Sequence, residues 1–139
     1  MALLSLVVVL FATAGSASAA TGTIQVGSGT LVARGVAVDV PVTVSLTCDE
    51  GFTSGFLDLV LSQAQGRTVA RGEGFAQVPS CAGETQTVTV RVDAFSAPFR
   101  GGSALADAGL LQCQEEPGFG LVCSPTGIGT SQVILITGR

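Results

Sequence analysis

The chain has 139 residues, of which 47% are hydrophobic and 12% are charged, and its net charge is −4. So apolar a sequence excludes intrinsic disorder and predicts a real hydrophobic core. Histidine and lysine are absent, which removes the usual general base, the Schiff-base amine and the imidazole metal ligand. Negative charge without any Tyr or Trp also argues against a nucleic-acid partner.

The first 19 residues are typical of a secretory signal peptide. Residues 2–11 form an apolar run interrupted only by Ser5, and small residues follow, ending in Ala17-Ser18-Ala19. An A-x-A site after such a run predicts cleavage after Ala19, whereas a membrane span needs roughly 20 apolar residues. We therefore expect a signal peptide over residues 1–19 and one secreted domain over residues 20–139, with no stable membrane insertion after cleavage.

Short stretches of alternating apolar and polar residues then predict strands. The clearest covers residues 36–48, in which every even position is apolar or cysteine. Successive side chains of a strand point to opposite faces, so this pattern predicts one buried face, and Pro41 predicts a bulge or a change of partner. The other predicted strands cover residues 23–33 with a break at 27–29, then 56–64, 67–77, 85–93, 104–113 and 129–137.

Seven short strands without a helical period predict an all-β fold, an antiparallel two-sheet immunoglobulin-like sandwich. We expect Val44 and Val90 to face its core, as well as Leu57, Leu59 and Leu61. The facing of residues 104–113 is ambiguous, because Leu105 and Leu111 oppose Leu110. We expect the alanines of this strand and Leu110 to point inward.

The four cysteines predict two disulfides, because a secreted chain meets an oxidising compartment. Three connectivities are possible. We favour Cys48 with Cys81 and Cys113 with Cys123, and the alternative pairs Cys48 with Cys113. A zinc site is disfavoured, since the chain has no C-x-x-C pair and no histidine. We expect no metal and no cofactor.

Several motifs are similar to those of small secreted immunoglobulin-like proteins of actinobacteria. They are V-A-V-D-V-P-V-T-V-S-L-T-C, L-V-L-S-Q, R-T-V-A-R-G-E-G, Q-T-V-T-V-R-V and P-F-R-G-G-S-A-L-A-D-A, followed by a terminal cysteine pair. The resemblance covers nearly all of residues 20–139 and implies a sandwich fold, but no established activity. The expected architecture is also similar to that of the ligand-carrying chromoprotein apoproteins typified by neocarzinostatin, although fold does not imply function.

Four phenylalanines lie in predicted loops: Phe52, Phe95, Phe99 and Phe119. Exposed aromatic residues would indicate a ligand or partner surface, whereas buried ones would plug the ends of the sandwich. The most suggestive group is Phe99-Arg100-Gly101-Gly102, since glycine lets a loop project and arginine can stack or pair with an anionic partner.

If the strands alternate in direction, their connections collect at two ends. We expect Arg34, Arg67, Arg100 and Arg139 at one end. The other end would carry the four cysteines and the carboxylates of Asp49, Glu50, Glu84, Glu115 and Glu116. Complementary ends could steer partners or stack copies head to tail.

The sequence therefore favours a secreted, non-enzymatic binding or cell-surface interaction module, with an extracellular protein or a small ligand as its partner. The alternative is a carrier of a small apolar molecule or an inhibitor of an extracellular enzyme. A deep apolar cleft would favour the carrier, and a filled core with an exposed loop patch would favour the module. The candidate binding residues are Phe99, Arg100, Arg34 and Arg67.

Overall fold

The computed structural model describes residues 19–138 as an all-β domain. Its strands are β1 (Thr21–Val26), β2 (Gly29–Val32), β3 (Ala37–Thr47), β4 (Ser54–Gln65), β5 (Thr68–Val78), β6 (Ala82–Ala94), β7 (Gly102–Glu116) and β8 (Gly120–Thr137). A short 3-10 helix, η1 (Ala33–Gly35), joins β2 to β3. The predicted signal peptide, except for Ala19, lies outside the described residues.

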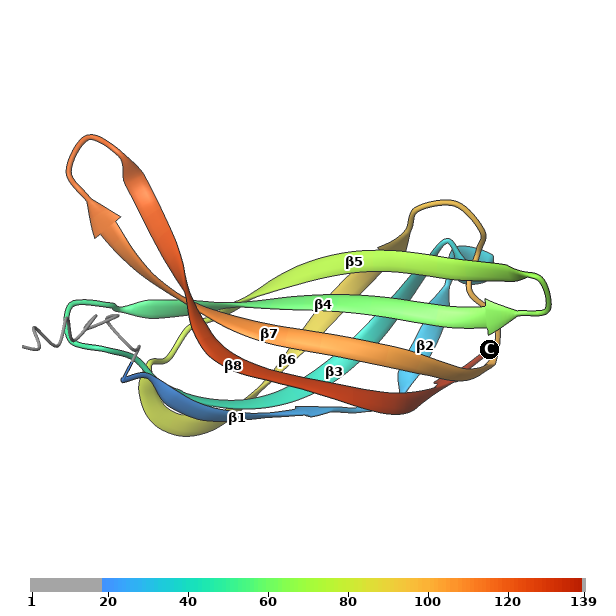
Figure 1. Cartoon of the computed structure of the whole chain (residues 1–139), viewed down its shortest axis with the longest axis horizontal. Coiled ribbons are helices and arrows are strands. Elements are labelled where there is room, and N and C mark those ends of the chain that lie inside the picture. The colour runs from blue at the N-terminus through green and yellow to red at the C-terminus, as the bar shows by residue number, and fades with distance from the viewer. Residues whose placement is uncertain (1–18, 139) are drawn as a thin grey trace, which may run out of the picture.

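The strands form one closed sheet (Figure 1) and not the two separate sheets of the predicted immunoglobulin-like sandwich. β3 pairs with β1 and β2 on one edge and with β6 on the other, and the order continues from β2 through β8, β7, β4 and β5 to β6. β1 and β2 follow each other along the same edge of β3, so the barrel has seven strands. The prediction of two separate sheets is wrong. A side-chain period of two shows which face of a strand is buried, but not which strands pair.

Pro41 lies where β3 changes its partner. The pairing with β1 ends at Val42, and the pairing with β2 begins at Asp39. Between them, the N–H of Gly27 donates a hydrogen bond to the carbonyl of Pro41 at 2.8 Å. The predicted change of partner at this proline is therefore confirmed.

The interior of the barrel is filled by small and branched apolar side chains. The buried residues include Val38, Val40, Val42, Val44, Leu46, Leu57, Leu59, Leu61, Val90, Val92, Ala104, Ala106, Ala108 and Leu110. The predicted inward positions of Val44, Val90, the three leucines of β4, the alanines of β7 and Leu110 are confirmed, and Leu105 points outward. Val36, the first residue of the predicted alternation, precedes β3 and is 59% exposed, so the prediction is wrong at this position.

The barrel is closed unevenly. β5 and β6 pair only at residues 72–73 of β5, where a Cβ on Gly72 would collide with the carbonyl oxygen of Asp93. On the opposite seam, β2 and β8 share a short parallel pairing, and the N–H of Val26 in β1 donates to the side-chain oxygen of Gln132 in β8 at 2.7 Å. The close approach at Gly72 therefore helps to close the barrel between β5 and β6, and the Gln132 hydrogen bond helps to close it between β1 and β8.

Both favoured disulfides are present. Cys48 is bonded to Cys81 and Cys113 to Cys123, with Cα atoms 5.2 Å and 4.0 Å apart. The first bond ties the β3–β4 loop to the β5–β6 connection, and the second joins directly opposite residues of β7 and β8. No free cysteine is found in the described residues.

The burial of Val44 predicts that Val44→Asp abolishes recovery of soluble protein. An unpaired carboxylate in this core costs several kcal/mol, against a total stability of about 5–15 kcal/mol for a domain. Thr43→Asp is the matched control, because the neighbouring side chain points to solvent. The yield of soluble, oxidised protein measures the difference, and equal yields would contradict the inward assignment.

Candidate functional site

The alternating strands place their connections at two opposite ends of the barrel (Figure 1). The end formed by η1, the β4–β5 turn and the β6–β7 loop carries Arg34, Arg67 and Arg100, and we call it the arginine end. The opposite end contains both disulfides, and we call it the cysteine end. It carries Asp49, Glu50, Glu84, Glu115 and Glu116. The predicted separation of these charges along the barrel is therefore confirmed for the described residues, and Arg139 lies outside them.

At the arginine end, the β6–β7 loop folds inward and is clamped by two glutamines. The buried side chain of Gln63 donates to the carbonyl of Arg100 at 2.8 Å and accepts from its N–H at 2.9 Å. Gln65 donates to the carbonyl of Pro98 at 2.9 Å. Phe99 is consequently only 2% exposed and plugs the barrel.

This burial corrects the prediction that Phe99 belongs to a binding surface. Of the four loop phenylalanines, Phe52 is half-buried, whereas Phe95 and Phe119 are 66% and 82% exposed. Of these four, the residues that can meet a partner are therefore Phe95 and Phe119. Sequence position alone did not separate them from Phe99, because the loop that carries Phe99 is held down by distant glutamines.

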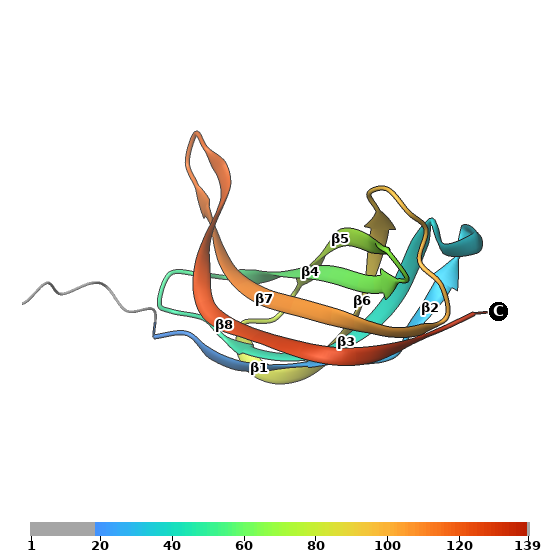
Figure 2. The ribbon, with the colours of Figure 1, turned by 45° about the vertical axis from the view of Figure 1, so that its right-hand side comes forward.

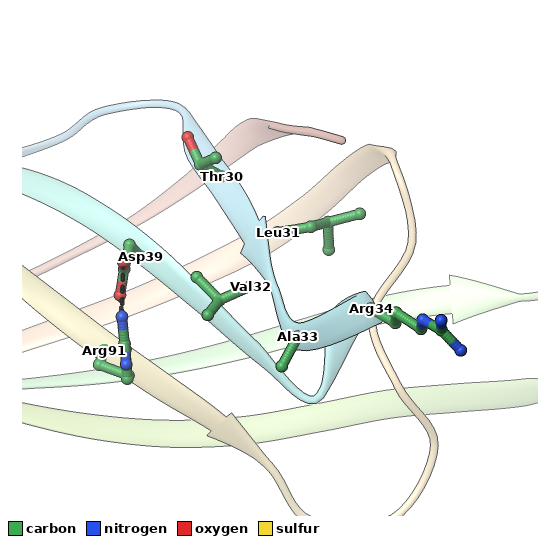
Figure 3. A pocket seen from close by; sticks show the side chains of 7 residues that line it. All are labelled: Thr30, Leu31, Val32, Ala33, Arg34, Asp39 and Arg91. Atoms are coloured by element: carbon green, nitrogen blue, oxygen red, sulfur yellow. Dashed lines mark hydrogen bonds and ion pairs between the residues drawn. The ribbon is translucent and has the colours of Figure 1, made fainter. Parts of the chain in front are cut away.

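A pocket of about 470 Å³ lies beside η1 on the outer surface (Figure 3). Thr30, Val32 and Ala33 line it, together with Arg34 and the pair formed by Asp39 and Arg91. Of the predicted binding arginines, only Arg34 lines it. Arg67 and Arg100 occupy other turns of the same end and are exposed.

The ion pair that lines this pocket is bidentate. The Nε and Nη2 atoms of Arg91 donate to the two carboxylate oxygens of Asp39 at 2.8 Å and 2.9 Å. The hydrogen bond from Arg91 holds the pKa of Asp39 below its usual value. Asp39 is thus ionised at neutral pH and keeps the guanidinium of Arg91 in place.

The rim of the pocket is a strained turn. Arg34 has φ 61° and ψ 34°, and Gly35 has φ 88°, which are the angles of the two central residues of a type I′ turn. Asn-Gly is the preferred pair there, and a left-handed arginine is uncommon. Ala33 is also left-handed, with φ 48°. Strain in two consecutive non-glycine residues is typical of sites where position matters more than stability.

At the cysteine end, the β7–β8 hairpin projects away from the barrel (Figures 1 and 2). We call residues 111–125 the arm. Its tip is a β-turn in which the N–H of Phe119 donates to the carbonyl of Glu116 at 3.1 Å. Pro117 follows Glu116, and Gly118 has φ 84°, as a type II turn requires. Phe119 therefore stands at the tip of a defined turn, 82% exposed.

The base of the arm is held by a disulfide and by a register shift. Cys113–Cys123 bridges the hairpin, and the shift lies between Gly109 and Leu111. Thr126 is buried there, and its hydroxyl donates to the carbonyl of Leu110 at 2.7 Å. A bulge of this kind bends a hairpin and increases its twist. The arm is thus a stiffened projection.

A third feature is a pair of carboxylates on the outer face of the sheet. Asp58 lies in β4 and Glu73 in the neighbouring β5, and Asp58 faces Phe75 across the pairing. Its Oδ1 atom is buried without a hydrogen-bond partner. Burial, together with the hydrogen bond and charge of Glu73, raises the pKa of Asp58 to about 6.

Residues 19–138 contain no cluster of three or more Cys, Asp or Glu side chains that could hold a metal ion. No helix in this part of the chain is long and apolar enough to cross a bilayer.

The chain matches no protein-family model, and no curated protein is similar to it. Among solved structures, it is similar to a solution structure described as that of a late embryogenesis abundant (LEA) protein. The TM-score is 0.37 and the identity is 14%, over 84% of this chain and 70% of the other. A likeness at this TM-score carries no argument about fold or function.

The carboxylate pair predicts a stability that falls as the pH rises through about 6. The folded state binds the proton of Asp58 more tightly than the unfolded state does, so its contribution is full at acid pH and is lost once Asp58 ionises at about pH 6. Asp58→Asn should raise the melting temperature at about pH 7.5. The melting temperatures at about pH 5 and about pH 7.5 should then differ less in the variant than in wild type.

Calorimetry at the two pH values measures this effect. Glu50→Gln is the control, since this exposed residue lies at the cysteine end. A pH difference that is the same in wild type and Asp58→Asn would refute the assignment.

The strained turn predicts that Arg34→Asn stabilises the protein. Asparagine tolerates the left-handed conformation better than arginine, so the melting temperature should rise by about 2–5 °C. The same substitution at Arg71, in the extended strand β5, should give no rise, because asparagine is disfavoured in strands. Thermal denaturation of both variants measures this effect. A lower melting temperature for Arg34→Asn would show that the turn is not strained.

Proposed function

We propose that this chain is a secreted, non-enzymatic binding module that holds a partner protein through its arm, with Phe119 as the anchor. The observation that carries the proposal is the exposure of this phenylalanine, 82%, at the tip of a disulfide-closed hairpin. Large aromatic residues that fill a partner's pocket dominate the energy of many interfaces. A rigid hairpin also loses little conformational entropy on binding.

The remainder of the arm supports this role. Leu121 is 47% exposed and lies opposite Glu115 in the hairpin. An apolar centre beside carboxylates is the usual composition of an interface patch, with a buried core and a charged rim. The filled interior of the barrel also favours an interaction module over a carrier, because a carrier needs an internal cavity for its ligand.

Two disulfides suit an oxidising, extracellular compartment, and the resemblance to small secreted immunoglobulin-like proteins of actinobacteria agrees with it.

Inhibition of an extracellular enzyme is the second candidate, because a stiff loop with one exposed aromatic residue suits a substrate cleft. Phe119 would make the contact both in a binding module and in an inhibitor.

The expected outcome is that Phe119→Ala loses at least about tenfold in partner capture, as an interface anchor does. The immobilised chain is exposed to the medium of the cells that produce it, and captured proteins are quantified by mass spectrometry. Phe75→Ala is the matched control, because Phe75 is 60% exposed on the barrel wall, away from the arm.

Equal capture by wild type and Phe119→Ala would overturn the role of the arm. If the captured protein is an enzyme, its inhibition by wild type but not by Phe119→Ala would select the second candidate.

A further inference from the structure

We propose that the partner is a second copy of this chain, whose pocket at the arginine end receives Phe119. The inference rests on the proposed function of the arm and adds the identity of what the arm binds. The arm and the pocket lie at opposite ends of the barrel, so each copy offers one of each.

The size of the pocket suits an aromatic side chain. Its volume of about 470 Å³ is within the range of sites that hold small ligands. Val32 and Ala33 supply apolar surface, and neither is fully buried in the single copy. Phe119 exposes the large apolar surface that such a site would cover.

The charges of the arm and the pocket are complementary. The arm carries Glu115 and Glu116 and no basic residue. The pocket carries two arginines against one carboxylate, so a positive charge remains after Arg91 has paired with Asp39. A glutamate arriving beside Phe119 would therefore meet Arg34 on the rim, and a bidentate Arg–carboxylate contact fixes orientation as well as position.

The backbone conformation of the rim also favours this contact. Arg34 is held in a left-handed conformation at the tip of its turn, where Asn would be less strained. Strain retained against an easier alternative points to a role for the side chain. The Arg34 side chain is exposed and points away from the other residues that line the pocket (Figure 3), so it can meet a carboxylate from another molecule.

The contact is heterologous, because it joins different surfaces of the two copies. A heterologous contact leaves one free arm and one free pocket after each step, so copies add head to tail unless the rotation closes a ring. The mass of the assembly should therefore rise with protein concentration beyond that of a dimer. Because the pairing includes ionic contacts, it should weaken with salt.

Sedimentation equilibrium of the purified, oxidised chain tests the inference. Wild type should show an average mass that rises with concentration, and less so in about 0.5 M than in about 0.05 M NaCl. Phe119→Ala, which lacks the anchor, and Arg34→Glu, which reverses the rim charge, should each weaken self-association at least about tenfold. Phe75→Ala and Arg71→Glu are controls outside the contact and should behave as wild type.

A mixture of the two deficient variants gives the decisive measurement. Phe119→Ala retains an intact pocket and Arg34→Glu retains an intact arm, so an equimolar mixture should form one-to-one dimers that grow no further. A mixture that stays monomeric, or a wild type that stays monomeric at every concentration, overturns the inference. If wild type is monomeric yet captures another protein through Phe119, only the identity of the partner is wrong, and if capture is also independent of Phe119, the proposed function fails with it.

Discussion

The pairing of β3 on both of its edges is the constraint on which the barrel depends. β6 runs beside it from Ala37 to Thr47, while β1 and β2 share the other edge. The apolar side chains of its inner face, from Val38 to Leu46, are fully buried. Buried apolar area stabilises by roughly 25 cal/mol per Å², and this strand also satisfies its backbone on both sides. β3 thereby joins β6 to the edge formed by β1 and β2, and the short pairings of β5 with β6 and of β2 with β8 close the sheet into a barrel.

The two ends follow from the same constraint. Neighbouring strands are antiparallel nearly everywhere, so connections alternate between the ends, and residues far apart in sequence meet there. At one end, Gln63 and Gln65 fasten the β6–β7 loop over Phe99, which removes this side chain from the surface. At the other end, the Cys113–Cys123 bond stiffens a hairpin whose tip extends beyond the barrel. The arginine end is therefore closed by a loop, and the cysteine end extends outward as the arm.

Much of the fold could be predicted from the sequence, because local periodicity and strand alternation reflect local physics. The alternation around Val44 and Val90 correctly predicts their burial, and the compartment argument correctly predicts two disulfides. Closure into a barrel could not be predicted, because it depends on the long-range pairing of β3 with β6. The arm was also missed, although the sequence Glu116-Pro117-Gly118-Phe119 between two cysteines is a recognisable type II turn signal.

Three features of this protein oppose stability, and none of them belongs to the barrel core. Phe119 is left in water, Arg34 is left-handed, and the Oδ1 atom of Asp58 is buried without a partner. The first two lie at opposite ends, on the arm and on the rim of the pocket. The barrel tolerates these features because the free energy that each one costs is small beside the stabilisation from its buried apolar core. Since an arm and a pocket at opposite ends of a stiff barrel cannot meet within one molecule, any contact between them joins two molecules.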